Sequence, residues 1–227
     1  MTVLHLKAVI FDLDGLVLDS ETGYVSAWRQ AAAELGYGLD DAFCRSLSGL
    51  HGESVERRLH ERFGNDFDVQ CFHRLSGAFW TEQVQRHGIP VKKGFFNVLS
   101  TVERLGLPFC LATYSSRENA VRCLKLAGLS EVFSSMITRD EVMQGKPAPD
   151  VFIAAAKCLG VAVGECLVLE DSAVGVAAAL AAGAPCVYVP SVYPPDNEAA
   201  AGALAVLDDL DQAAGFILDC RAWAFQA

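Results

Sequence analysis

Near-continuous apolar runs recur along this chain, and each is followed by turn residues and then by a helical pattern. The first run spans 7–11, and later runs span 108–112, 135–138, 166–169 and 186–189. Runs without polar alternation are typical of strands buried on both faces, as in a parallel sheet. The pattern therefore predicts a sheet of parallel strands with helices on both sides.

Helical patterns fill the segments between the later strands, at 94–104, 117–127, 149–159 and 173–182. Pro149 fits the first turn of its helix, and a glycine directly follows the last two segments, as is common at helix ends. Regular alternation of strand and helix favours right-handed crossovers. We therefore expect an α/β fold, a doubly wound parallel sheet.

The first strand breaks this rhythm, because no buried strand pattern follows it until about residue 90. Four helical patterns occupy the interval, at 21–35, about 40–47, 54–63 and 67–87. This predicts a helical domain at 17–89, inserted into a core made of 1–16 and 90–227. The tail after about residue 192 predicts only a loop and a closing helix.

Charge and composition narrow the classes of partner. The formal net charge of the 227 residues is -10, and Lys and Arg are scattered, so we expect neither a nucleic-acid nor a membrane partner. The 8 cysteines form no C-x-x-C pair and several lie in apolar runs, which indicates reduced, buried thiols. No secretory signal is visible, because the first apolar run ends at Asp12. We expect a soluble, cytoplasmic protein, and a monomer.

Polar side chains follow four of the predicted strands, at the edge where parallel sheets bind ligands. They are Asp12 and Asp14 after the first strand, Thr113 and Tyr114 after the second, Lys146 beyond the third, and Glu170 and Asp171 after the fourth. Acidic groups, a hydroxyl and a lysine therefore meet on one rim. Phosphoryl transfer from an ester needs such a set.

The chemistry assigns a role to each group. A dianionic phosphate ester repels a carboxylate unless a cation lies between them, and Asp12 and Asp171 offer the oxygen ligands that Mg²⁺ prefers. The main-chain carbonyl of Asp14 adds another ligand. Lys146 and Thr113 then contact the transferring phosphoryl group. Asp12 attacks phosphorus and becomes an acyl phosphate, while the Asp14 side chain protonates the leaving oxygen and later accepts a proton from water.

Each motif has a purely structural alternative. Asp and Gly are common turn residues, Lys146 could be an exposed loop lysine, and the acidic run ending in Ser172 could cap the next helix. Thr113 could only satisfy main-chain groups at a strand end. A calcium loop is excluded, because Leu16 occupies the next ligand position. The combination of all four motifs, in order and at strand ends, favours the catalytic interpretation.

Four runs, FDLDGLVLDSE, LATYSSR, GKPAPDVF and LEDSAVGV, resemble in this order the motifs of the haloacid dehalogenase-like hydrolase superfamily. The helical insertion resembles the cap of the β-phosphoglucomutase and phosphoglycolate phosphatase branch. The resemblance implies a Rossmann-like core and a cap that closes over the substrate. It also implies Asp12 as nucleophile, Asp14 as acid/base, Thr113, Tyr114 and Lys146 around the phosphate, and magnesium at Asp12, Asp14, Asp171 and Glu170.

Two departures distinguish this chain from the phosphosugar mutases that it resembles. The cap arginine of those mutases falls on Gly52, and a histidine that follows their first motif falls on Tyr24. We therefore expect a magnesium-dependent phosphatase that hydrolyses a small phosphate monoester, such as a sugar phosphate, a nucleotide or a phospho-acid. A β-phosphoglucomutase-type mutase is the alternative. A receiver-like signalling module has a different motif order, and a dehalogenase has no use for Asp14.

Two cap residues are candidates for contacting the organic part of the substrate. His51 lies in a loop between two predicted cap helices, which could equally be a plain connector. Glu21 opens the first cap helix, where Asp19 or Ser20 is expected as the cap and Glu21 would favour the helix dipole. Tyr114 could narrow the entrance to the site or could pack as an ordinary aromatic.

Overall fold

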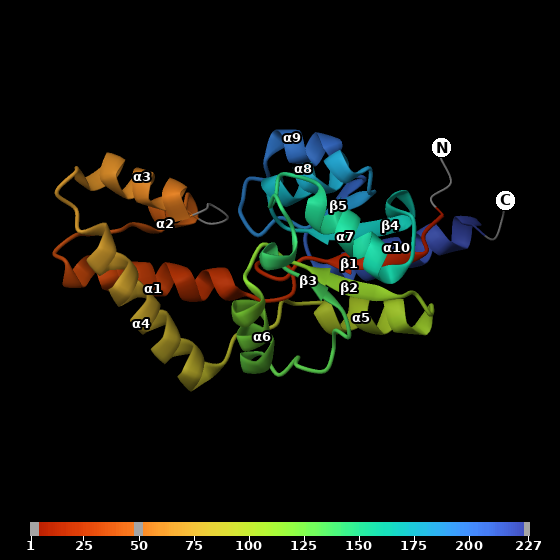
Figure 1. Cartoon of the computed structure of the whole chain (residues 1–227), viewed down its shortest axis with the longest axis horizontal. Helices are drawn as coiled ribbons and strands as arrows, with labels where there is room; N and C mark the ends of the chain where they lie inside the picture. Colours follow the sequence, from red (N-terminus) through yellow and green to blue (C-terminus); the bar gives the residue numbers. More distant parts are fainter. Residues whose placement is uncertain (1–4, 48–51, 225–227) are drawn as a thin grey trace. The chain divides into compact units, whose positions relative to one another are not determined.

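The computed structural model describes residues 5–47 and 52–224 (Figure 1). These residues contain a six-stranded, fully parallel sheet in the order β3-β2-β1-β4-β5-β6. The predicted α/β class and doubly wound parallel sheet are confirmed. The strands are β1 (Ala8–Phe11), β2 (Phe109–Ala112), β3 (Met136–Ile137), β4 (Cys166–Glu170), β5 (Cys186–Tyr188) and β6 (Ala205–Val206).

The register aligns the carboxyl ends of the central strands. Phe11 of β1 pairs with Leu111 of β2 and with Leu169 of β4. The main-chain N–H of Asp12 continues the ladder to the carbonyl of Leu169 at 3.1 Å. Residues that follow these three strands consequently emerge at the same edge of the sheet.

Helices cover both faces of the sheet. The helices of this part are α5 (Phe95–Arg104), α6 (Arg117–Leu126), α7 (Asp150–Leu159), α8 (Ala173–Ala182), α9 (Asn197–Gly202) and α10 (Leu210–Ala224). Short 3-10 turns lie at Arg139–Glu141 and Val163–Glu165. Helices α7 and α8 pack on the face that carries Ala8 and Ile10. Helices α5 and α10 pack against each other on the opposite face.

Aromatic side chains fill this second face. Successive residues of a strand point to opposite sides, so Phe11 faces away from Ile10 and toward α5. Its ring lies 6.1 Å from Phe95, 6.0 Å from Phe109 and 5.9 Å from Phe133, with edge-to-face geometry in each case. The unbroken apolar sequence of β1 is explained by this burial on both sides.

The tail differs from the expected loop and closing helix. Helix α9 and strand β6 precede α10, and Ala205 of β6 pairs in parallel with Val187 of β5. The side chain of Asp196 caps α9 by accepting the N–H of Ala199 at 2.9 Å. The prediction for the tail was therefore incomplete, because a two-residue strand carries no periodicity of its own.

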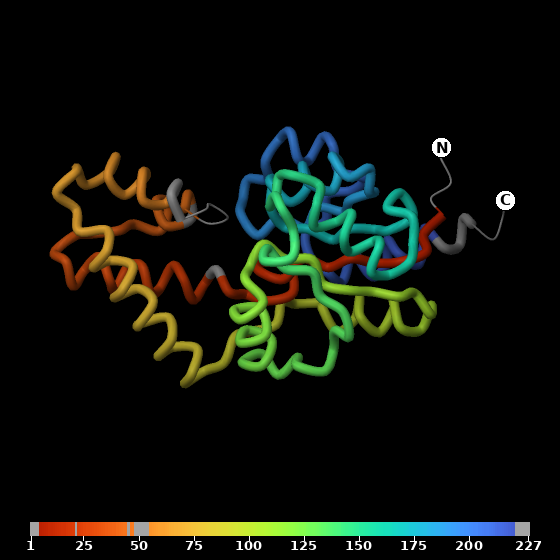
Figure 2. Tube along the Cα trace, in the orientation of Figure 1, coloured from red at the N-terminus to blue at the C-terminus, as the bar shows by residue number. Residues whose placement is uncertain are grey.

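A second compact unit comprises residues 19–90, whereas 1–18 and 91–227 form the first. Figure 2 traces the chain leaving the first unit after β1 and returning before α5. The second unit starts two residues after the predicted insertion, 17–89, and ends one residue after it. Its helices are α1 (Ser20–Glu34), α2 (Asp41–Arg45), α3 (Gly52–Phe63) and α4 (Val69–His87).

The helical unit has its own apolar core, which includes Leu59, Phe67 and Phe72. Helix α1 begins as expected, because Asp19 accepts the main-chain N–H of Thr22 at 3.4 Å and its hydroxyl at 2.9 Å. A side-chain oxygen at this position satisfies one of the N–H groups that a first helical turn leaves without a partner.

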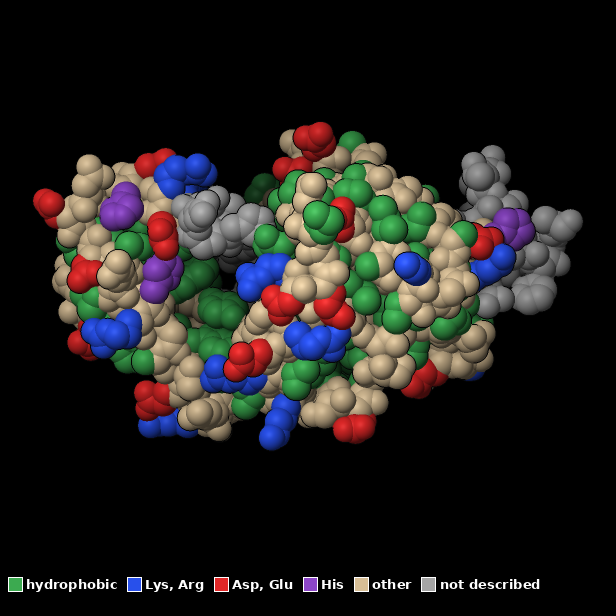
Figure 3. All heavy atoms as spheres, in the orientation of Figure 1, with side chains coloured by type: hydrophobic (Ala, Val, Ile, Leu, Met, Phe, Trp, Pro, Cys, Tyr) green, Lys and Arg blue, Asp and Glu red, His purple; other side chains and the backbone are tan. Residues whose placement is uncertain are grey.

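The charged side chains are scattered over the face that Figure 3 shows, and most of the cysteines are buried. Lys and Arg side chains alternate with Asp and Glu over the visible face, without a patch of one sign (Figure 3). Within the described ranges, no helix combines the length and the apolar character needed to span a bilayer. The eight cysteines all lie in the described ranges and form no disulfide there. The predicted burial applies to those at positions 44, 110, 123, 166 and 186.

Candidate active site

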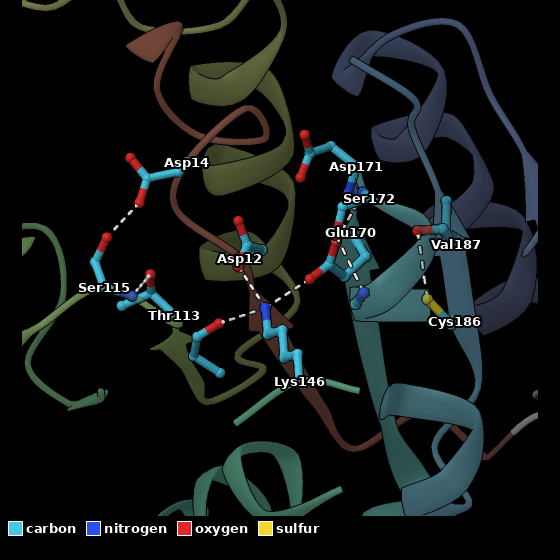
Figure 4. A network of polar contacts seen from close by, with 12 residues as sticks. Asp12, Asp14, Thr113, Ser115, Lys146, Glu170, Asp171, Ser172, Cys186 and Val187 are labelled. Carbon is cyan, nitrogen blue, oxygen red and sulfur yellow. Dashed lines mark hydrogen bonds and ion pairs between the residues drawn. The ribbon is translucent and has the colours of Figure 1, made fainter. Parts of the chain in front are cut away.

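A buried lysine lies at the centre of the polar residues on the sheet edge. The ammonium of Lys146 donates to Asp12 Oδ1 at 2.5 Å, to Glu170 Oε1 at 2.5 Å and to the carbonyl of Ala112 at 3.2 Å (Figure 4). An ammonium has three protons, so each of them has an acceptor. The alternative of an exposed loop lysine is wrong, because this side chain is 4% exposed.

Burial and charge act in opposite directions on this pair. Burial lowers the pKa of Lys146, but the adjacent charges of Asp12 and Glu170 and their hydrogen bonds outweigh it and raise the pKa. The two carboxylates therefore favour the protonated, charged form of Lys146. Burial raises the pKa of Asp12, Lys146 opposes that shift, and the negative charges of Glu170 and Asp14 add to it. A nucleophilic carboxylate at this position consequently needs further positive charge close by.

Glu170 holds the lysine and does not point toward open space. Its Oε1 accepts from Lys146, and its Oε2 accepts from the N–H groups of Asp171 and Ser172, both at 2.9 Å, and from the Ser172 hydroxyl at 3.0 Å. Ser172 also caps α8 by accepting the N–H of Gly175 at 3.1 Å. The capping alternative therefore describes Ser172, whereas Glu170 positions Lys146.

Asp171 lies against the loop that follows β1. A Cβ atom built on Gly15 would lie 2.0 Å from Asp171 Oδ2, so only a glycine leaves room for this carboxylate. Gly15 also has a φ of +87°, which favours glycine. Figure 4 shows Asp12 between Asp14 and Asp171, with one oxygen directed toward Lys146 and the other away from it.

Gly15→Ala is expected to displace the Asp171 carboxylate and lower activity by more than about tenfold. The matched control is Gly183→Ala, because Gly183 has a similar φ of +76° but no atom within 4 Å of the methyl group that alanine would add. Both variants carry the strain of positive φ, and both should unfold at lower urea concentration. Steady-state kinetics should separate them, since only Gly15→Ala loses activity. Equal losses in the two variants would contradict the steric explanation.

Asp14 receives a hydrogen bond that the sequence did not suggest. The hydroxyl of Ser115 donates to Asp14 Oδ2 at 2.7 Å, and the N–H of Ser115 donates to Thr113 Oγ1 at 3.0 Å. Thr113 is buried at the end of β2, so its hydroxyl helps to fix the turn that carries Ser115. Ser115 belongs to the LATYSSR motif, but no pattern in the sequence links it to Asp14.

The ring of Tyr114 packs on the loop that carries Lys146. A Cβ atom on Gly145 would lie 1.5 Å from Cε2 of Tyr114, so the ring rests directly on that glycine. The guanidinium of Arg139 lies 5.8 Å from the centroid of the same ring. Of the two alternatives for this side chain, the packed aromatic agrees with these contacts.

The donor set fits a magnesium ion held by few protein ligands. Among the described residues, no three His, Cys, Asp or Glu side chains converge as a metal-binding group. The candidate ligands are the carboxylates of Asp12 and Asp171 and the main-chain oxygen of Asp14. Mg²⁺ commonly binds one or two carboxylates and keeps several waters, so this small set is sufficient. The edge carries four carboxylates against one ammonium, so it would repel a phosphate dianion unless a cation were bound.

Neither of the two cap residues predicted to contact the substrate has a described side chain. His51 lies outside the described residues, and of Glu21 only the main chain is described, in the first turn of α1. Tyr24, where the mutases have a histidine, stacks on Trp80 at 5.2 Å and on Trp28 at 6.1 Å within the helical unit.

Comparison with known proteins agrees with this geometry. Residues 6–183 match the sequence model of a family described as haloacid dehalogenase-like hydrolase. The plasmid protein CbbY of Cupriavidus necator is 32% identical over 223 residues, which cover 90% of this chain and 86% of that protein. Hexitol phosphatase A of Escherichia coli is 31% identical over 182 residues, which cover 79% of this chain and 81% of that protein.

The fold also has relatives among solved structures. A HAD family hydrolase from Deinococcus radiodurans R1, crystallised with bound phosphate and sodium, superposes with a TM-score of 0.80 at 27% identity. The superposition covers 96% of this chain and 97% of that chain. The similarity therefore extends through both compact units and is not limited to the sheet.

Proposed function

The chain belongs to the haloacid dehalogenase-like hydrolase family, and from that premise we propose that it is a magnesium-dependent phosphatase of small phosphate monoesters. The predicted membership of this family is confirmed. The observation that carries the proposal is the buried Lys146, which holds the carboxylates of Asp12 and Glu170 at the edge of the sheet beside Asp14 and Asp171. The expected cytoplasmic location stays a prediction.

Asp12 is the proposed nucleophile. Its Oδ1 is fixed by Lys146 at 2.5 Å, so the carboxylate has a defined orientation before the substrate arrives. One carboxylate oxygen attacks phosphorus as the bond between phosphorus and the ester oxygen breaks, which gives a phosphoryl-aspartate. Lys146 balances the charge of Asp12 Oδ1 throughout. Because its protons already have acceptors, Lys146 acts on the phosphoryl group chiefly through its charge.

Magnesium would be held by the carboxylates of Asp12 and Asp171 and by the main-chain carbonyl of Asp14. When bound, it supplies the positive charge that allows a carboxylate and a phosphate dianion to approach each other. Glu170 is not included in the proposed ligand set, because both of its oxygens accept other hydrogen bonds. Thr113 and Tyr114 remain proposed phosphate contacts. Because the Tyr114 ring packs on Gly145, Tyr114 would contribute through its main chain.

Asp14 is the proposed acid and base. It donates a proton to the ester oxygen as the alcohol leaves, and the carboxylate that results then accepts a proton from water. That water attacks the phosphoryl-aspartate, releases inorganic phosphate and restores Asp12. Both half-reactions balance with one water consumed and one alcohol released.

A phosphorylated sugar or polyol is the proposed substrate class. The name of the Escherichia coli relative, hexitol phosphatase A, supports a polyol phosphate. A mutase is less well supported, because Gly52, which replaces the mutase arginine, has no side chain to bind a second phosphate. The stack of Tyr24 on Trp80 similarly leaves no imidazole at the position of the mutase histidine.

Phosphate release from a panel of esters tests the proposal. Sorbitol 6-phosphate, glucose 6-phosphate, a nucleoside monophosphate, phosphoglycolate and β-glucose 1-phosphate are each incubated with Mg²⁺ or with chelator. We expect many turnovers with at least one ester, a loss of more than about 100-fold on chelation, and recovery when Mg²⁺ is restored. Full activity in chelator would contradict the metal. Isomerisation of β-glucose 1-phosphate with a bisphosphate primer, without phosphate release, would establish the mutase.

A further inference from the structure

Three hydrogen-bonded side chains form a row along one side of α6 that leads to Asp14. The thiol of Cys123 donates to Asn119 Oδ1 at 3.8 Å, and Asn119 Nδ2 donates to Ser115 Oγ at 3.4 Å. Ser115 Oγ donates in turn to Asp14 Oδ2 at 2.7 Å. The three residues are spaced by four, so they share one side of the helix and its preceding turn.

The direction of these hydrogen bonds is fixed by chemistry. Cys123 is buried, which raises the pKa of its thiol to about 12, so the sulfur carries a proton and donates it. The Asn119 amide must then present its oxygen to Cys123 and its nitrogen to Ser115. Because the Ser115 hydroxyl accepts from Asn119, its own proton is directed to Asp14.

The main chain of Ser115 is also held by hydrogen bonds. Its N–H donates to Thr113 Oγ1 at 3.0 Å, and its carbonyl accepts from the N–H of Arg139 at 3.2 Å. The position of the hydroxyl relative to β2 is therefore determined by the fold. Asp14 lies in the loop that follows a different strand, β1, and is 101 residues from Ser115 in sequence.

We infer that Ser115 is a positioning residue, which holds the Asp14 carboxyl by Oδ2 and so directs Oδ1 to the leaving oxygen of the ester. The inference rests on the proposed function. The Ser115 proton occupies Oδ2, so the proton that Asp14 transfers is carried on Oδ1. The same bond stabilises the carboxylate that remains once the proton has moved to the alcohol.

Phenyl phosphate and p-nitrophenyl phosphate test this role, because they have similar shapes but leaving groups of different acidity. Phenolate needs a proton more than the weakly basic p-nitrophenolate does. We expect Ser115→Ala to lower kcat/KM by about 10- to 30-fold for phenyl phosphate and by at most about threefold for p-nitrophenyl phosphate. The value of kcat/KM depends only on the steps up to phosphoryl transfer, so the later attack of water on the phosphoryl-aspartate does not affect it.

Two further variants separate positioning from folding. Ser116→Ala removes the cap of α6, where Ser116 Oγ accepts the N–H of Asn119 at 3.3 Å, but leaves the Ser115 hydroxyl in place. It should lower both values of kcat/KM by similar, small factors. Ser115→Thr retains a hydroxyl and should restore most of the loss. If Ser116→Ala reproduced the selectivity of Ser115→Ala, the role would be structural and the inference wrong.

A background without the acid completes the test. In Asp14→Asn, adding Ser115→Ala should change kcat/KM for phenyl phosphate by less than about twofold, because the two residues act through one proton transfer. If Ser115→Ala still lowered kcat/KM about tenfold in the Asp14→Asn background, as it does in the wild type, Ser115 would act independently of Asp14. Wild-type protein that released no phosphate from either aryl ester or from the panel would instead overturn the proposed function itself.

Discussion

Replacing Asp12 by asparagine is expected to lower phosphate release by roughly 10⁴-fold or more, since an amide cannot form the acyl phosphate. The change is nearly isosteric, so it removes the nucleophile without removing volume. Lys146 keeps its hydrogen bond to Glu170 at 2.5 Å and becomes one half of a neutral pair. Quenched-flow kinetics and intact-protein mass spectrometry should detect a phosphorylated species in the wild type and none in Asp12→Asn.

The fold of this variant provides the control. Removing one buried negative charge next to Glu170 and Asp14 relieves repulsion, and the amide oxygen can still accept a hydrogen bond from Lys146, although the ion pair is lost. The urea midpoint should therefore remain close to that of the wild type. Activity within tenfold of the wild type in a correctly folded Asp12→Asn would exclude the covalent mechanism. A variant that failed to fold would instead contradict the stability argument.

Lys146→Met is expected to produce the second large effect, on stability and activity together. It leaves the carboxylates of Asp12 and Glu170, both formerly 2.5 Å from the ammonium, buried beside each other without a cation. Loss of one partner of a buried ion pair typically costs about 3–5 kcal/mol in the free energy of unfolding. Urea unfolding followed by circular dichroism measures this loss, and phosphate release should fall below detection.

Two companion variants isolate the cause. Lys93→Met breaks the ion pair to Asp209 at 2.8 Å, but this lysine side chain is 77% exposed, so the urea midpoint should hardly move. Adding Glu170→Gln to Lys146→Met removes one of the two stranded charges and should recover part of the stability, without recovering activity. If Lys146→Met unfolded at the same urea concentration as the wild type, the buried pair would have no structural role.

The fold was largely predictable because most of its strands are buried on both faces. Such strands appear as unbroken apolar runs, and β1, β2, β4 and β5 were located from these runs to within one residue. Strand β6 was missed for a physical reason. Ala205 and Val206 are extended because they pair with β5, and an Ala-rich tail offers no local pattern that distinguishes them.

The site was predictable as a set of residues but not as a set of contacts. The strand ends identified Asp12, Lys146 and Asp171, since parallel strands bring their carboxyl ends to one edge. Glu170 was grouped with Asp171 by its place in the sequence. Alternation along a strand could have separated them, because adjacent side chains point to opposite sides. The hydrogen bond from Ser115 to Asp14 joins two loops that are 101 residues apart in sequence, which no local signal encodes.

The contacts of Glu170 also determine which positions can be varied together. One oxygen of this side chain holds Lys146, the other closes the turn before α8 through Ser172, and a Cβ on Gly175 would lie 1.8 Å from Oε1. Glu170, Ser172 and Gly175 contact one another, so a substitution at one of them changes the surroundings of the other two. A search for altered metal preference should therefore keep Glu170, Ser172 and Gly175 fixed and explore Asp171 and its surroundings.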